Sequence, residues 1–231
     1  MNSRLTKANV RERTQEYWEK DQKEKRECYI SELLGQELNE ANNDPDRLLG
    51  VGQPVHTLAL TVGESFEPLL QVVCVLKPQR VVLILNSFYG NTPGIDHGSD
   101  LKQLMLKLGE DSLPANFRTQ LNNDNFDLIE LPQDTPTHVF RALRDALQKQ
   151  EAQPPDGFTN VVDITGAKKS MVVGAFLYAA HSDLPITYVD FDDYDKGELL
   201  PKNWAPFRPF LVQPLGLKSA PDAAALQIRP A

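Results

Sequence analysis

The densest group of residues that could do chemistry follows an apolar run late in the chain. Residues 163–171 read Asp-Ile-Thr-Gly-Ala-Lys-Lys-Ser-Met and come directly after Val161-Val162. They offer a glycine, two hydroxyls, two ammonium groups and the expected start of a helix. Free N–H groups at a helix start and nearby lysines suit phosphodiester oxygens. The segment therefore favours a phosphate-binding loop, with a solvated turn as the alternative.

A second candidate loop follows an earlier apolar run and reads Gly-Glu-Ser-Phe-Glu-Pro over residues 63–68. Gly63 allows a tight turn and the close approach of a ligand. Ser65 is expected to be the N-cap of the next helix, with Pro68 in its first turn. The helix start and the Ser65 hydroxyl could hold a phosphate, or these residues could only turn and cap the chain.

A third loop contains Asn86, Ser87 and Phe88, again directly after an apolar run. Amide and hydroxyl groups can read the edge of a base, and an aromatic ring can stack on its face. We expect a base or ribose site here, with an ordinary turn as the alternative.

Better-known motifs do not fit these loops. A Walker A alignment would put Asp163 and Lys168 at its two glycine positions. The glycines of 50–52 precede the first expected strand, and Val55 stands at the third glycine position of a dinucleotide fingerprint. Glu67 occupies the last glycine position of a nucleophile elbow, which makes a serine hydrolase a poor fit.

Strands and helices that alternate along the chain must position these loops. The expected strands are 55–62, 80–85, 126–131, 159–164 and 186–191, and the expected helices are 66–76, 100–107, 136–150 and 169–181. Continuous apolar strands such as 81–85 suit a sheet that is covered on both faces. We therefore predict an α/β fold with a doubly wound, mainly parallel sheet, whose ligands bind at the carboxyl ends of the strands.

The chain divides into an N-terminal helical extension (1–52), a Rossmann-like domain (53–218) and a tail or linker (219–231). From Tyr29 onward, apolar residues at helical spacing predict a helix with one apolar face. We expect that face to pack on the main domain or on a partner chain.

Composition excludes several classes of function. The chain has 231 residues, and 24 basic against 32 acidic residues give 24 − 32 = −8, so we expect no direct DNA binding. Cys28 and Cys74 form no CxxC pair, which disfavours a cysteine-based metal site. The apolar run 69–76 is too short for a bilayer, so we expect a cytoplasmic protein without a membrane span.

With these loops in order, the chain resembles a CRISPR-associated Rossmann fold (CARF) domain over residues 53–218. The resemblance lies in the glycine-serine turn with a nearby proline at 63–68, the late motif at 163–171, and the strand residues Tyr-Val-Asp at 188–190. The late motif departs from the family pattern, because Ala167 replaces a second glycine and Lys168 replaces a threonine, while Lys169 keeps the family lysine.

The resemblance implies a sensor of type III CRISPR antiviral signalling, in which a homodimer holds a cyclic oligoadenylate across its two-fold axis. Cyclic tetra-adenylate is the expected ring, no metal or cofactor is expected, and the effector would be a separate or fused element or residues 1–52. The expected ligand-binding residues are Gly63, Glu64, Ser65, Asn86, Ser87, Phe88, Thr165, Gly166, Ala167, Lys168, Lys169 and Met171.

The alternative is a metal-independent ring nuclease that cleaves the ring to linear products with a 2′,3′-cyclic phosphate. Ser65 and Lys169 would then be its catalytic residues. None of the four histidines lies in the three loops, so no general base is evident. His97 and His138 are expected at the surface, and His181 at the end of a helix.

Overall fold

The protein is built around one six-stranded sheet with the strand order β3-β2-β1-β4-β5-β6. The computed structural model describes residues 20–35, 38–39, 52–63, 65–86, 97–110, 113–190 and 208–212. Its strands are β1 (Val55–Val62), β2 (Arg80–Leu85), β3 (Phe126–Glu130), β4 (Thr159–Asp163), β5 (Ile186–Asp190) and β6 (Arg208–Val212). The first five are parallel, and β6 pairs with β5 in the antiparallel direction.

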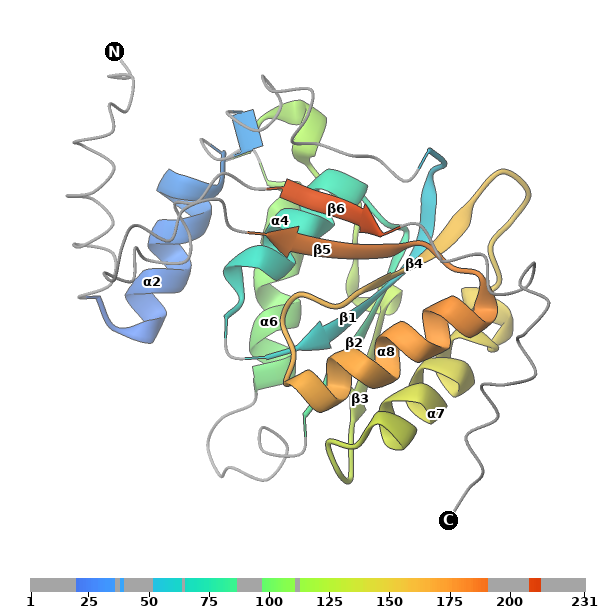
Figure 1. Ribbon diagram of the computed structural model, residues 1–231. Coiled ribbons are helices and arrows are strands. Elements are labelled where there is room, and N and C mark those ends of the chain that lie inside the picture. The colour runs from blue at the N-terminus through green and yellow to red at the C-terminus, as the bar shows by residue number, and fades with distance from the viewer. Residues whose placement is uncertain are drawn as a thin grey trace.

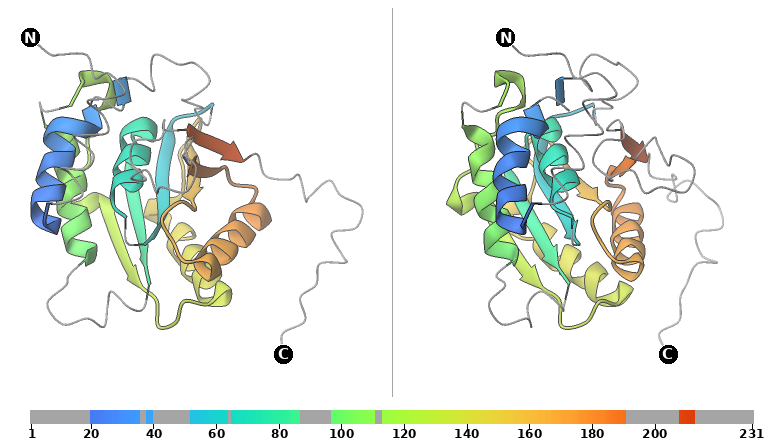
Figure 2. Two further views of the ribbon diagram at one scale, coloured as in Figure 1. Left: turned by 60° about the vertical axis from the view of Figure 1, so that its left-hand side comes forward. Right: turned by 90° about the vertical axis from the view of Figure 1, so that its left-hand side faces the viewer.

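Helices cover both faces of this sheet (Figure 1). The longer ones are α4 (Glu67–Leu76), α6 (His97–Leu106), α7 (Pro136–Leu147) and α8 (Lys169–Ser182). Short 3-10 turns connect the elements: η2 (Lys107–Gly109), η3 (Ala115–Phe117), η4 (Asn123–Asn125) and η5 (Gln150–Ala152). Figure 2 shows α4 and α6 on one side of the sheet and α7 and α8 on the other.

The core therefore has two layers, and the alternation of side chains along the central strands divides residues between them. Leu58 and Leu60 of β1 pack into the layer of α4 and α6, whereas Ala59 packs into the layer of α7 and α8. In β2, Leu83 belongs to the first layer and Ile84 to the second. Burial on both faces explains why these strands are apolar without interruption.

The predicted fold class is confirmed, with two local corrections. Strand β6 was not among the predicted strands, because Pro209 within Arg-Pro-Phe-Leu-Val is typical of an edge strand or a loop. It lies at the edge of the sheet, where proline is tolerated. The N-cap of α4 is Phe66 without a side-chain cap, so the prediction of Ser65 at that position was wrong by one residue.

An N-terminal helical segment packs on the α4 and α6 side. It consists of α2 (Gln22–Cys28) followed by a π-helical turn, η1 (Tyr29–Leu33). Its buried residues Tyr29, Ile30 and Leu33 join the core layer of α4 and α6, as do Leu34 and Leu38, which follow it in the chain. The expected apolar face is thus buried against the Rossmann-like sheet, as Figure 2 shows for α2 and α6.

Within the part of the chain that the structure describes, no helix is both long and apolar enough to cross a bilayer. The predicted tail 219–231 and residues 1–19 lie outside that part.

Candidate anion-binding site at the switch point of the sheet

The predicted loops meet where the chain changes direction in the sheet. Strands β1 and β4 are parallel neighbours at its centre. The chain leaves β1 through α4 toward β2, and it leaves β4 through α8 toward β5 on the opposite side. The loops after β1 and β4 therefore diverge from one point, which is where doubly wound sheets bind ligands.

Two glycines make the crossing of these loops possible. A Cβ added to Gly63 would lie 1.5 Å from the carbonyl oxygen of Gly166. A Cβ added to Gly166 would lie 2.8 Å from the carbonyl oxygen of Thr61. Both positions thus require glycine for packing alone, in addition to the ligand contacts that the sequence predicts for them.

A fully buried carboxylate holds the loop after β4. Asp163, the last residue of β4, accepts hydrogen bonds from the Thr165 amide (3.0 Å), the Thr165 hydroxyl (3.1 Å) and the Thr187 hydroxyl (2.9 Å). Burial raises the pKa of Asp163 to about 6, and the three hydrogen bonds oppose this by favouring the charged form. Asp163 was not among the predicted site residues, although the buried acid at the end of an apolar strand was a usable signal.

The Thr165 hydroxyl also ties this loop to the next strand. It accepts a hydrogen bond from the Val189 amide at 2.8 Å while it donates to Asp163. Both roles of the hydroxyl are therefore used within the fold. Thr165 was predicted as a ligand contact, and the structure gives it an internal, loop-positioning role.

The N-terminus of α8 follows this loop and has no side-chain cap. Its N-cap residue is Lys168, and the first helical hydrogen bond runs from the Val172 amide to the Lys168 carbonyl at 3.0 Å. The amides of residues 169–171 precede that bond and have no helical acceptor. Together with the partial positive charge of a helix start, they form a surface that favours an anion.

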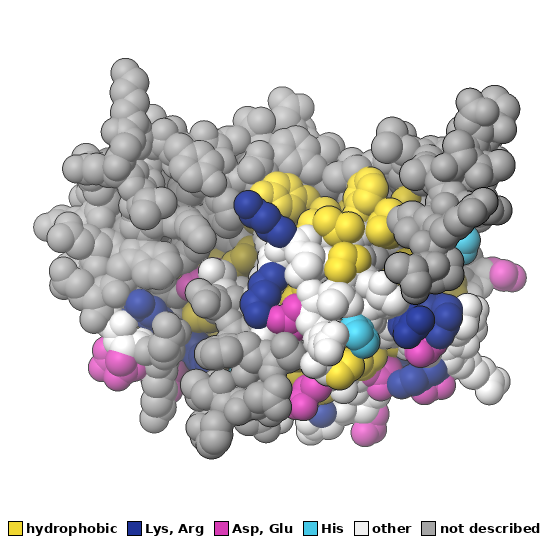
Figure 3. Space-filling view, turned by 60° about the horizontal axis from the view of Figure 1, so that its bottom comes forward, with side chains coloured by type: hydrophobic (Ala, Val, Ile, Leu, Met, Phe, Trp, Pro, Cys, Tyr) yellow, Lys and Arg dark blue, Asp and Glu magenta, His cyan; other side chains and the backbone are white. Residues whose placement is uncertain are grey.

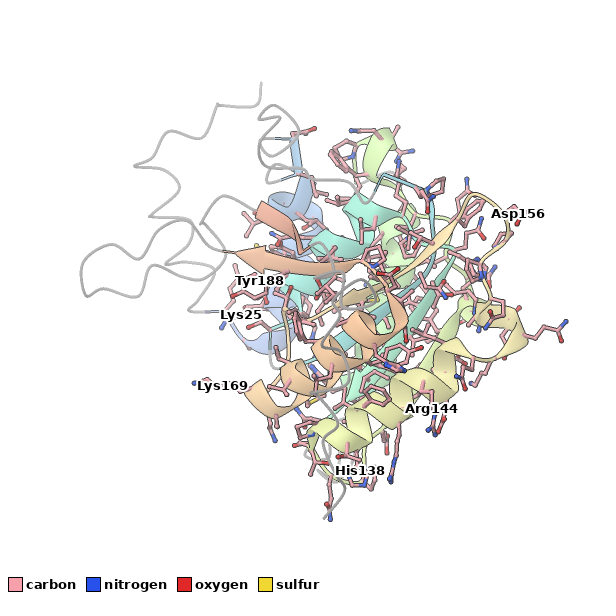
Figure 4. The ribbon with its side chains drawn as sticks, turned by 45° about the vertical axis from the view of Figure 1, so that its right-hand side comes forward. Lys25, His138, Arg144, Asp156, Lys169 and Tyr188 are labelled. Carbon is pink, nitrogen blue, oxygen red and sulfur yellow. The ribbon has the colours of Figure 1, made fainter. Side chains whose placement is uncertain are left out.

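The two lysines of the motif are in different situations. Lys168 Nζ lies 2.6 Å from Asp134 Oδ2, an ion pair between the loop after β4 and the segment before α7. Lys169 is exposed and makes no ion pair or hydrogen bond with any residue in the described ranges. In Figure 4 it projects from the first turn of α8. Of the two lysines, Lys169 is therefore the one without a competing carboxylate among the described residues.

The remaining predicted ligand-binding residues differ in burial, and some lie outside the described residues. Ser65 and Ala167 are half-buried beside the crossing, and Asn86 is buried at the end of β2. The Met171 side chain is fully buried in the core layer of α7 and α8, so it leaves only its amide to the helix start. Three predicted contacts lie outside the described residues: Glu64, Ser87 and Phe88.

The prediction that His97 lies at the surface was wrong. His97 begins α6, three residues before the predicted helix start, and is buried instead of exposed. Its Nε2 lies 3.2 Å from the carbonyl oxygen of Gly63. Burial lowers the pKa of His97, which favours the neutral ring; the hydrogen bond to Gly63 acts in the opposite direction.

Two further histidines lie on α7 and α8. His138 is half-buried, with Nδ1 2.7 Å from the Thr135 hydroxyl at the start of α7. His181 is exposed in the last turn of α8, as predicted. No group of three or more His, Cys, Asp or Glu that could hold a metal occurs among the residues whose positions are described.

Comparisons with known proteins give matches only among solved structures. No protein-family model matches the chain, and no curated protein does. The chain is similar to Can2 from Sulfobacillus thermosulfidooxidans in complex with cyclic tetra-adenylate, with 20% identity, a TM-score of 0.39, and coverage of 58% of this chain and 32% of that one. It is also similar to Csm6 from Enterococcus italicus bound to cyclic hexa-2′-fluoro-hexa-dAMP, with 11% identity, a TM-score of 0.42, and coverage of 62% and 35%.

A third similar structure is protein VC1899 from Vibrio cholerae, with 12% identity, a TM-score of 0.39, and coverage of 58% of this chain and 30% of that one. The match thus spans about a third of each of these chains.

Proposed function

We propose that the protein is a CARF-type sensor that binds a cyclic oligoadenylate at the crossing of the loops after β1 and β4. The observation that carries the proposal is the N-terminus of α8, which has no side-chain cap and directly follows the Gly63–Gly166 crossing. Its first turn carries Lys169, which has no ion-pair partner among the described residues. Amide donors, a helix start and one available cation match a phosphodiester group, which carries a single negative charge.

The proposed ligand is shared by two copies of the chain. A ring with two-fold symmetry suits a two-fold site, because each subunit contacts half of it with the same residues. Helix α8 supports this arrangement: Lys169, Val173 and Leu177 follow one another at four-residue spacing and share one face. Val173 is 48% exposed and Leu177 39% exposed, on a helix that is apolar nearly all round.

A further exposed apolar side chain lies on β5, the strand beside the edge strand β6. Tyr188 of β5 is a further large exposed side chain, and Figure 3 shows hydrophobic side chains gathered beside Lys and Arg on this side of the molecule. An apolar stripe that begins at Lys169 is a suitable surface for a second copy, since pairing would bring two Lys169 side chains toward one ligand.

Titration calorimetry with cyclic tri-, tetra- and hexa-adenylate tests the proposal, with linear tetra-adenylate as the ligand control. We expect the cyclic tetramer to bind, and Lys169→Ala to weaken it by about 1–3 kcal/mol, roughly a fivefold to 150-fold loss of affinity. Lys77→Ala is the matched control, since Lys77 is exposed at the opposite end of the strands, just before β2. Absence of binding by every ring would refute the proposed function.

A second experiment on the same protein distinguishes a sensor from a ring nuclease. Incubation with cyclic tetra-adenylate in EDTA followed by chromatography should return intact ring for a sensor. Linear product with a 2′,3′-cyclic phosphate would identify the enzyme instead, with Ser65 and Lys169 as the residues to substitute first.

A further inference from the structure

The N-terminal helical segment contacts the proposed ligand loop through an aromatic pair. Tyr29 of η1 is fully buried, and its ring lies edge-to-face against Phe66 with 5.8 Å between the centroids. Phe66 is the N-cap residue of α4 and stands three positions after Gly63. Edge-to-face pairs of this kind stabilise a particular placement of both rings. The position of the loop after β1 is therefore coupled to that of η1.

A second connection reaches the same loop through α6. Arg26 Nη1 of α2 lies 2.6 Å from Asp100 Oδ2, and Asp100 is one helical turn after His97. The His97 ring is buried, and its Nε2 is 3.2 Å from the Gly63 carbonyl oxygen. Because the Asp100 side chain is half-exposed, the ion pair contributes little by itself. The buried His97 contact is the stronger part of this connection.

The backbone of the N-terminal helical segment departs from an α-helix where it contacts Phe66. Residues 29–33 form a π-helical turn, with the Leu34 amide bonded to the Tyr29 carbonyl. Such turns are rare and occur frequently at functional sites. Here the turn carries the aromatic residue that touches the loop, while Ser31 and Glu32 remain exposed. The unusual backbone is thus located at the contact with Phe66.

We propose that Tyr29 and His97 are positioning residues for the loop after β1. Tyr29 couples the N-terminal helical segment to this loop, His97 fixes the loop from α6, and both thereby set its affinity for ligand. This inference rests on the proposed function for the identity of the ligand. Coupling between a site and an element is reciprocal. Ligand that fixes the loop must therefore also stabilise the docking of α2 and η1, which makes this segment the element that reports occupancy.

The first experiment needs no ligand. Amide hydrogen exchange of residues 65–70, which span the end of the loop after β1 and the first turn of α4, is compared between the wild-type chain, His97→Leu and Tyr29→Leu, together with the urea midpoint of each. We expect these amides to exchange faster in both variants than in the wild type. The increase should exceed the one that the lower global stability, measured by the urea midpoint, would cause. His97→Gln, whose side-chain amide can donate to the Gly63 carbonyl, and Tyr29→Phe, which keeps the ring, should restore slow exchange. Wild-type exchange in the two leucine variants would overturn the proposal.

The second experiment adds cyclic tetra-adenylate. The affinity of His97→Leu should fall roughly threefold to tenfold, the scale of one hydrogen bond, and His97→Gln should bind within about twofold of wild type. Ligand should also slow exchange across residues 24–34 of the wild type. If the wild type binds the ring while α2 and η1 exchange as before, the coupling is refuted. If no ring binds, the proposed function fails, and the ligand-free exchange still decides the positioning roles.

If a leucine variant fails to fold, a comparison of His97→Asn with His97→Gln tests the role of His97 instead. His97→Asn has a shorter side chain than His97→Gln and is expected to leave the Gly63 carbonyl without its donor. Equal loop exchange in these two variants would contradict the role of His97.

Discussion

The backbone of Gly63 passes so close to Gly166 that a methyl group on the first would lie 1.5 Å from the carbonyl oxygen of the second. This contact joins the ends of β1 and β4, two strands whose loops are about a hundred residues apart in sequence. It gives Gly63 a packing requirement that is independent of any ligand, and the Thr61 carbonyl oxygen gives Gly166 one as well.

Gly63→Ala should destabilise the fold, because the added carbon can only be accommodated if the two loops separate. Overpacking of a tight contact costs about 1–3 kcal/mol, occasionally more, and we expect the upper part of that range in urea unfolding. Gly109→Ala is the graded control, since its added carbon would meet, among the described residues, only the Thr119 carbonyl oxygen, at 3.0 Å. Equal stability of the two variants would show that the loops are not held together as described.

Lys168 and Lys169 should contribute unequally to binding. Asp134 competes with a phosphate for the Lys168 ammonium group, whereas Lys169 has no such competitor among the described residues. We expect Lys169→Ala to reduce affinity for cyclic tetra-adenylate more than Lys168→Ala does. Asp134→Asn should increase affinity, because it releases Lys168. A larger loss for Lys168→Ala than for Lys169→Ala, measured by calorimetry at one salt concentration, would reverse this assignment.

Asp163 should make stability depend on pH in a defined direction. Its pKa of about 6 in the folded chain exceeds the ordinary aspartate value of 3.8, so the folded state binds its proton more tightly than the unfolded state does. The resulting stabilisation is complete below pH 4 and is lost as the pH rises through 6. Two pKa units correspond to about 3 kcal/mol at most, at about 1.4 kcal/mol per unit.

Comparison with Asp163→Asn isolates this contribution, because the other titrating groups, His97 included, are common to both proteins. The free energy of unfolding of the wild type minus that of the variant should fall between pH 4 and pH 6. A difference that stays constant over this range would mean that the Asp163 pKa is not raised.

The apolar stripe on α8 should control oligomeric state. Leu177→Glu places a charge in the exposed face that we propose for the second copy, and it should convert a dimer into a monomer in light scattering. Leu128→Glu is the control, since Leu128 is equally exposed (39%) but lies on β3, at the opposite end of the strand order from β5 and β6. A wild-type monomer, or a dimer that survives Leu177→Glu, would exclude this interface.

The sequence by itself determined the five parallel strands and the loops that follow them, but not the edge strand β6. Runs such as Val81–Leu85 are apolar at every position, a pattern that a sheet with two covered faces requires. The predicted bounds of β1 and β2 agree with the structure at both ends. The glycines at 63 and 166 and the lysines at the start of α8 were also recognisable, because turn and helix-start chemistry is local.

Only the tertiary structure decided which of these side chains are available to a ligand. The Lys168–Asp134 ion pair depends on how the start of α7 lies against the loop after β4, and the sequence separation of 34 residues gives no sign of it. Likewise, Met171 is buried because α8 packs on one face of the sheet. His97 reaches the Gly63 carbonyl because α6 packs on the other face. Side-chain exposure is set by contacts between distant segments, which hydrophobic periodicity within one segment does not contain.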